Sequence, residues 1–163
     1  NGSNTVTLGN DAVTALYCEV TSITGISDER VKDNVQDSAV GLDFINALRP
    51  VKYQKKHPSE FPEEIREARW AEKTKTNISD SGEITEYTVP ADEKPSDWQP
   101  RTEYGLIAQE VKAAMDSHNA TDWQGHTVTP NGTEALGYGS LVTVLVKAVQ
   151  ELTARIAVLE AGD

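Results

Sequence analysis

The sequence has few of the residues that cross-link a protein or bind metal. Among its 163 residues there is one cysteine, Cys18, so no disulfide can form within the chain. No cysteine and histidine residues cluster, and His57, His118 and His126 are scattered through polar segments, so the pattern predicts surface histidines and no metal site. The longest apolar runs fall far short of the roughly 20 residues that a helical bilayer span needs. We therefore expect no disulfide, no metal and no membrane segment.

Aromatic residues are also scarce, and basic residues are outnumbered. Hydrophobic residues make up 37% and aromatic residues 6% of the chain, which fits one modest domain or a small domain with an appendage. Twenty-six acidic against 15 basic residues give a net charge of -11, and such a surface repels phosphate. We expect neither nucleic acid nor a membrane as a partner. The chain begins at Asn1, without methionine or a leader pattern, and we interpret it as the C-terminal piece of a longer protein.

Residues 4–17 alternate in two short β-prone runs around the turn signal Gly9-Asn10-Asp11. A lone pair of such strands cannot bury its apolar face. The pattern therefore predicts strand or β-solenoid material that pairs with other chains or with upstream residues, and an unstructured linker is the open alternative.

The middle of the chain predicts a helix, a strand and a polar insertion. Apolar residues at helical spacing predict a short helix over residues 40–48, with Asp37 or Ser38 as its N-cap and Pro50 after its end. Apolar and polar residues alternate over residues 51–55, which predicts a strand. Residues 56–101 are polar and proline-rich, and turn residues at 78–84 predict a hairpin tip, so we expect a protruding insertion. Within it, residues 63–73 could form a solvated helix.

The C-terminal part predicts two further helices. Leu106, Ile107, Val111 and Met115 would share one face of a helix that starts at Tyr104, and residues 119–134 read as loop and short strand. Residues 138–159 then carry apolar residues in the a/d pattern of a coiled coil, with Val or Ile at a and Leu at d from Leu145 on. The alternative for this stripe is a core helix of a monomer. The a/d residues are Tyr138, Val142, Leu145, Val149, Leu152, Ile156 and Leu159.

The segment with the most reactive side chains is residues 25–32, where Ser27 and Lys32 lie five apart. Five helical steps separate two side chains by about 140°, and an odd separation in a strand places them on opposite faces. Only a turn or a neighbouring subunit could join them, and a helix start followed by a solvated lysine explains the same residues. Gly137-Tyr138-Gly139 reads as a helix cap, and the carboxylate pairs Glu63-Glu64 and Asp92-Glu93 read as solvated.

Four ordered blocks nevertheless resemble a known family, the intramolecular chaperone auto-processing domain. This is the C-terminal domain of phage endosialidase tailspikes, tail fibres and neck appendages. The resemblance covers residues 27 to about 160, with only the polar insertion unmatched. The blocks are Ser27-Asp28-Glu29-Arg30-Val31-Lys32-Asp33-Asn34-Val35, Leu48-Arg49-Pro50-Val51-Lys52-Tyr53, Tyr104-Gly105-Leu106-Ile107-Ala108-Gln109-Glu110-Val111, and Tyr138-Gly139-Ser140-Leu141 leading into residues 145–152.

The resemblance implies a homotrimeric chaperone that helps a β-rich fibre to assemble and then releases itself by serine-dependent cleavage. Ser27 would be the nucleophile, Lys32 the base and Ile26-Ser27 the scissile bond, while Asp28 and Arg30 are possible supporting residues. Arg30 is the nearest charge that could lower the pKa of a lysine base, and Asp28 could hold a turn or orient Lys32. No cofactor is expected. Since Val at a with Leu at d does not by itself select trimers, the trimer depends on the resemblance.

We therefore expect an α+β fold with two parts. Residues 1–26 would end a β-rich fibre or spike stem, and residues 27–163 would form the chaperone domain, with its insertion at about 57–101 and a coiled-coil helix at about 138–160. Its partners would be two copies of itself and the upstream part of its own chain, in the host cytoplasm during assembly, with the stem remaining in the virion tail. A non-catalytic trimerisation or receptor-binding fibre tip is the alternative. We also expect the Ser27 and Lys32 side chains to meet only when protomers pack.

Overall fold

The computed structural model describes residues 17, 19, 24–79, 81, 82 and 84–162, and the chain divides into two compact units, residues 1–39 and 40–163. In the first unit, residues 24–39 are exposed and contain one 3-10 helix, η1 (Glu29–Val31). Of the predicted strand segment 4–17 only Tyr17 is described, and Cys18 also lies outside the described residues.

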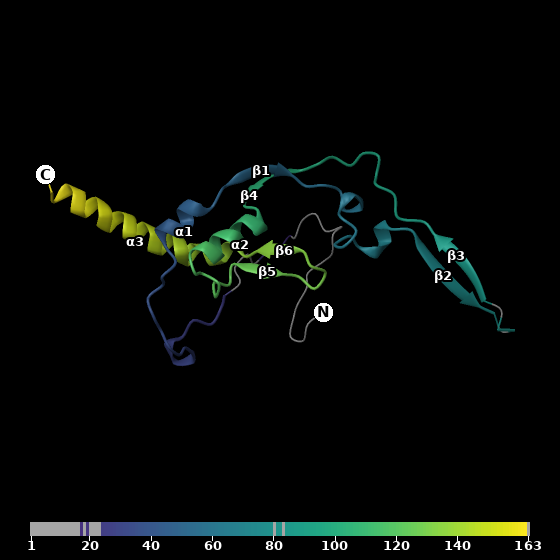
Figure 1. The fold of residues 1–163 in the computed structure, drawn as a ribbon, viewed down its shortest axis with the longest axis horizontal. Coiled ribbons are helices and arrows are strands. Elements are labelled where there is room, and N and C mark those ends of the chain that lie inside the picture. The colour runs from purple at the N-terminus through teal and green to yellow at the C-terminus, as the bar shows by residue number, and fades with distance from the viewer. Residues whose placement is uncertain (1–16, 18, 20–23, 80, 83, 163) are drawn as a thin grey trace. The chain divides into compact units, whose positions relative to one another are not determined.

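The second unit mixes short helices and strands, as expected for an α+β fold (Figure 1). Its strands form three separate antiparallel pairs, β1 with β4, β2 with β3 and β5 with β6. The helices are α1 (Leu42–Ala47), α2 (Ala108–Ser117) and α3 (Leu141–Glu160), with 3-10 helices η2 (Pro58–Glu60), η3 (Ala68–Trp70) and η4 (Tyr138–Ser140). The strands are β1 (Val51–Gln54), β2 (Lys73–Ile78), β3 (Ile84–Val89), β4 (Thr102–Gly105), β5 (His126–Val128) and β6 (Glu134–Leu136).

The hydrophobic core lies where the three α-helices meet. Phe44 of α1 is 1% exposed and packs with Val111 and Met115 of α2 and with Val144 of α3. The Phe44 ring also meets the Trp123 ring edge-on at a centroid distance of 5.3 Å. The helical spacing of apolar residues in 40–48 is therefore confirmed as a core-facing helix.

Truncating Phe44 should be the most destabilising single change in this core. We expect Phe44→Ala to lower the free energy of unfolding by about 3–5 kcal/mol, because it removes a buried ring and leaves a cavity. Val128→Ala, at an exposed position of β5, is the control and should change it by less than about 0.5 kcal/mol. Chemical denaturation followed by circular dichroism measures both, and equal midpoints would show that Phe44 does not anchor the core.

The N-terminus of α1 differs from the expected cap. Gly41, rather than Asp37 or Ser38, is the N-cap, and no side chain of its own segment caps the helix. Instead, the Leu42 amide donates to Oε2 of Glu151 in α3 at 2.8 Å. A Cβ on Gly41 would lie within 2.6 Å of the same carboxylate, so glycine permits this close approach. A residue more than 100 positions away thus replaces the local cap.

The predicted helix that starts at Tyr104 is wrong at its beginning. Residues 102–105 form β4, which pairs with β1 so that Lys52 lies opposite Tyr104, and α2 starts only at Ala108. Pairing between strands 50 residues apart overrides the local helical pattern here. The apolar face is confirmed for Val111 and Met115, which are buried.

The polar insertion contains the predicted hairpin. β2 and β3 pair through six registered positions from Lys73↔Val89 to Ile78↔Ile84, so the tip falls at residues 79–83. Gly82 adopts a φ of +80°, which is the left-handed conformation that favours glycine in such turns. The predicted helix over 63–73 is wrong: the segment holds turns and the single 3-10 turn η3, whose Trp70 is buried beside His57.

The α3 helix packs on the core through a different face from the predicted seam. Val144 and Ala148 are buried, whereas the a/d residues from Tyr138 to Leu159 are between 46% and 72% exposed. The stripe is therefore not the packing face of a monomeric core helix. A mostly apolar groove lies along it and is lined by Val142, Leu145, Val146, Val149 and Gln150.

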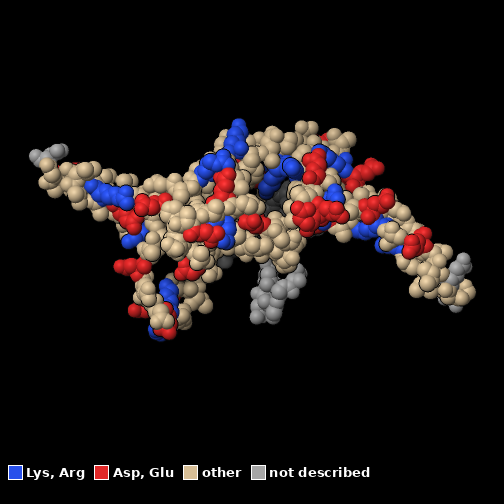
Figure 2. Space-filling model, in the orientation of Figure 1, with Lys and Arg blue, Asp and Glu red and all other residues tan. Residues whose placement is uncertain are grey.

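Charged side chains of both signs occur together on the visible face of the described residues (Figure 2). On the face shown in Figure 2, Lys and Arg side chains alternate with Asp and Glu and do not gather into one basic patch. Among the described residues, no helix combines the length and hydropathy that crossing a membrane requires.

Candidate active site

The structure brings Ser27 and Lys32 together within one chain. Lys32 Nζ donates a hydrogen bond to Ser27 Oγ at 2.9 Å. A serine hydroxyl and a lysine amine at this distance can exchange a proton once the amine is neutral. The pair is therefore a candidate nucleophile and base, and it lies directly after the Ile26-Ser27 peptide bond.

A 3-10 turn between the two residues produces this contact. The Val31 amide donates to the Asp28 carbonyl at 3.1 Å, and the Lys32 amide donates to the Glu29 carbonyl at 3.0 Å. Both residues that flank η1 are extended, so the chain enters and leaves a single tight turn. The α-helix and strand geometries that would separate Ser27 from Lys32 do not apply. The expectation that the two side chains meet only when protomers pack is wrong.

Asp28 and Arg30 are hydrogen-bonded to each other within the same turn. Asp28 Oδ1 accepts from the Arg30 backbone amide at 2.9 Å and from Arg30 Nε at 3.0 Å. Asp28 Oδ2 accepts from Nη2 at 2.6 Å and from Nε at 3.2 Å. Asp28 is thus the N-cap of η1, the role that its position after Ser27 suggested.

The guanidinium of Arg30, followed by its backbone amide, lowers the pKa of Asp28 below its ordinary value, and the Asp28 carboxylate raises the pKa of Arg30. A depressed carboxyl pKa means that Asp28 is ionised above its ordinary pKa and loses its charge only as the pH falls through the lowered value. The ion pair therefore persists across the neutral range. The sequence suggested that the positive charge of Arg30 could favour a neutral lysine at position 32. Because that charge is paired with the Asp28 carboxylate, its effect on Lys32 is weaker than expected.

A sequence model of the family described as chaperone of endosialidase matches residues 27–119, more than half of the chain. The chain belongs to this family. No curated protein and no solved structure matches the chain. Membership gives this chaperone of endosialidase domain a chaperone role, and the matched segment includes Ser27, Lys32 and the core helices α1 and α2.

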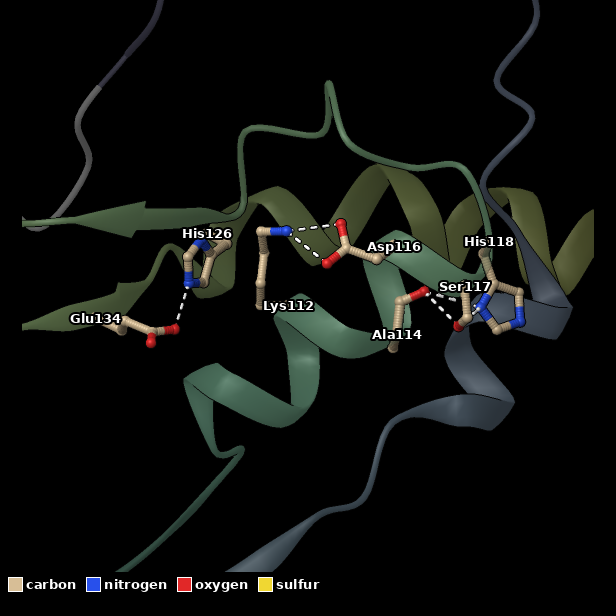
Figure 3. A network of polar contacts seen from close by, with 7 residues as sticks. All are labelled: Lys112, Ala114, Asp116, Ser117, His118, His126 and Glu134. Carbon is tan, nitrogen blue, oxygen red and sulfur yellow. Dashed lines mark hydrogen bonds and ion pairs between the residues drawn. The ribbon is translucent and has the colours of Figure 1, made fainter.

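The histidines of the chaperone domain are less exposed than the sequence suggested. His57 is 4% exposed and lies between the rings of Trp70 and Trp98, at centroid distances of 4.8 and 5.3 Å. The His126 side chain is 8% exposed, and its Nε2 lies 2.8 Å from Glu134 Oε2 on the paired strand (Figure 3). Both are satisfied by structural partners. Among the described residues no group of three or more His, Cys, Asp or Glu side chains is placed to hold a metal ion.

Figure 3 also shows the polar contacts of α2, which join neighbours on one helix. Lys112 Nζ contacts both Asp116 carboxylate oxygens at 2.6 Å, and His118 Nδ1 lies 2.9 Å from the Ala114 carbonyl. These are an i,i+4 ion pair and a helix C-cap contact, neither of which includes a free nucleophile.

The other sequence candidates remain structural. Glu63, Glu64, Asp92 and Glu93 are exposed within the insertion, as expected for solvated carboxylates. The glycines around Tyr138 begin η4, and the Tyr138 hydroxyl accepts a hydrogen bond from the Leu106 amide at 2.8 Å. This bond joins η4, which precedes α3, to the residue that follows β4. Sequence reasoning missed it because the two residues are 32 positions apart.

Proposed function

We propose that this domain is a self-cleaving chaperone that drives trimerisation of an upstream fibre or tailspike segment and then releases itself at Ile26-Ser27. The observation that carries the proposal is the 2.9 Å contact between Lys32 Nζ and Ser27 Oγ, held by a turn immediately after that peptide bond. The family supplies the chaperone role. Assembly would take place in the host cytoplasm, and the stem would remain in the virion tail.

The cleavage needs no bound cofactor or separate substrate. Neutral Lys32 takes the proton of the Ser27 hydroxyl as Oγ attacks the Ile26 carbonyl carbon. The bond between the Ile26 carbonyl carbon and the Ser27 nitrogen then breaks, and protonated Lys32 gives its proton to the departing Ser27 amine. The Ile26 acyl group is now bonded to Ser27 Oγ as an ester. Water hydrolyses this ester, which gives an Ile26 carboxylate and regenerates the Ser27 hydroxyl. Each chain cuts once.

Trimer assembly would be driven by the exposed stripe on α3. Leu145 and Leu152 are 46% and 47% exposed in the single chain, and the groove at Leu145 is lined mostly by apolar side chains, with Gln150 as its polar residue. Apolar a/d residues on a helix of this length bury their surface by packing against copies of themselves. The same step would act on the active site: residues 24–39 are exposed, and a lysine base needs desolvation or positive charge to become neutral. We propose that assembly covers the preformed pair.

The decisive experiment expresses the domain with its upstream stem and follows the chain on a denaturing gel. Wild type should give two fragments, the smaller beginning at Ser27 by N-terminal sequencing, and Ser27→Ala should stay whole because no nucleophile remains. Ser38→Ala, another exposed serine of the same unit, is the control and should cut like wild type.

A wild-type chain that folds, assembles and stays whole would contradict self-cleavage. That result would favour the non-catalytic alternative, a trimerisation or receptor-binding fibre tip, for which Ser27 has no special role. Cutting by Ser27→Ala at the same bond would exclude Ser27 as the nucleophile.

A further inference from the structure

We infer that Asp28 and Arg30 form a positioning clamp that holds the turn in which Lys32 reaches Ser27. The inference rests on the proposed self-cleavage and goes beyond it by assigning a role to two residues that do not touch the reacting atoms. The clamp consists of the Asp28 carboxylate and the Arg30 guanidinium and backbone amide.

The clamp spans the residues that separate nucleophile from base. Asp28 directly follows Ser27, and Arg30 is two residues before Lys32. Four hydrogen bonds join them. The Asp28 carboxylate accepts one from the Arg30 backbone amide, two from Arg30 Nε, one on each oxygen, and one from Nη2, at distances from 2.6 to 3.2 Å. Arginine presents these donors as a rigid fork, which fits a carboxylate in two places at once. The carboxylate therefore fixes both the backbone and the side chain of Arg30.

Among the residues that the structure describes, few other contacts hold the turn. No residue of η1 is buried, so no apolar packing selects this conformation. Two backbone hydrogen bonds close the turn, and a 3-10 turn of three residues is weakly stable by itself. Without the clamp, the segment would visit extended conformations in which a separation of five residues places Ser27 and Lys32 apart. The clamp raises the fraction of chains in which the proton transfer can occur.

A positioning role differs from a direct electrostatic role for Arg30. If Arg30 acted only by its charge on Lys32, removing that charge would shift the pH at which cleavage reaches half its maximal rate but would leave the maximal rate at high pH unchanged. In the clamp, removing either partner should lower the maximal rate itself, because fewer chains hold the turn, and any midpoint shift caused by the partner left unpaired is a separate effect. The two partners should also act as one unit, so that losing both is no worse than losing one.

The test measures cleavage rates of the stem-containing chain after dilution from denaturant, across a range of pH. The variants are Asp28→Asn, Arg30→Met and the double substitution, and Glu29→Gln in the same turn is the control. We expect the maximal rate of each single variant to fall by up to about fivefold, because each loses the exposed ion pair while the N-cap remains: an asparagine side chain still accepts from the Arg30 amide, and Arg30→Met leaves Asp28 in place. The maximal rate of the double variant should match that of the slower single variant, and Glu29→Gln should stay within about twofold of wild type. Arg30→Lys should restore only part of the rate, since an ammonium cannot reproduce the fork.

Trimer content is measured for every variant by size-exclusion chromatography with light scattering. Multiplicative losses in the double variant would overturn the clamp, as would single variants whose maximal rates stay at the wild-type value whatever the midpoint does, or a rate loss that follows loss of the trimer. Wild type that never cuts would instead overturn the proposed function, and the inference would fall with it. Lower maximal rates in single and double variants that remain trimeric, with the double variant no slower than the slower single variant, support the clamp.

Discussion

Replacing Lys32 by arginine should leave the chain folded and assembled but uncut. An arginine guanidinium stays protonated in proteins, so it can donate to Ser27 Oγ as Lys32 does but cannot accept the hydroxyl proton. Positive charge and side-chain length are largely retained, and the exposed position tolerates the change. Loss of cleavage should therefore be complete on the gel, while the chromatographic size of the assembly is unchanged.

Lys112→Arg is the matched control for this substitution. Lys112 is also exposed and also makes a side-chain contact, an ion pair with Asp116 on α2, but it has no part in the proposed reaction. We expect it to cut at the wild-type rate. Cleavage at normal speed by an assembled Lys32→Arg chain would remove Lys32 from the mechanism and leave the 2.9 Å contact as a structural hydrogen bond.

The local part of the candidate site could be predicted from sequence, whereas its geometry could not. Ser27, Asp28 and Lys32 were identifiable from their block, and Asp28 had the residue type of an N-cap. Periodicity describes only helix and strand, and neither joins residues five apart, so the sequence left a turn and a neighbouring subunit as alternatives and could not choose the turn that the structure uses. The aspartate two residues before an arginine is the local signal that could have pointed to a tight turn. In such a turn one carboxylate can accept hydrogen bonds from both the backbone amide and the guanidinium of the arginine.

The fold shows the same division between local and distant information. The hairpin tip and the core-facing positions Phe44, Val111 and Met115 follow from patterns within about ten residues. The start of α2 and the cap of α1 depend on partners far along the chain, β1 for Tyr104 and Glu151 for Leu42. A short stretch of sequence around either element does not contain its partner. The core face of α3 could not be predicted for a different reason. It contains the small residue Ala148, which marks a buried face less clearly than the large apolar residues of the neighbouring stripe do.

Replacing Leu145 and Leu152 together by glutamine should give monomers that do not cut. Both are d positions of the α3 stripe, and unpaired amides in the seam would cost on the order of several kcal/mol per trimer. The monomer should still fold, because α3 is anchored to the core by Val144 and Ala148 on another face. Light scattering measures the oligomer, circular dichroism the fold, and a denaturing gel the cleavage.

Ala154→Gln with Ala157→Gln is the matched control, because it adds two amides to exposed positions of α3 outside the stripe. This variant should assemble and cut like wild type. Ser27 and Lys32 already touch in the single chain, so assembly would have to gate the reaction by changing the surroundings of the pair, either by desolvation or by a positive charge from another chain. A folded monomer that cuts at Ile26-Ser27 would show that the turn alone suffices. A Leu145/Leu152 variant that stays trimeric would show that the stripe is not the seam.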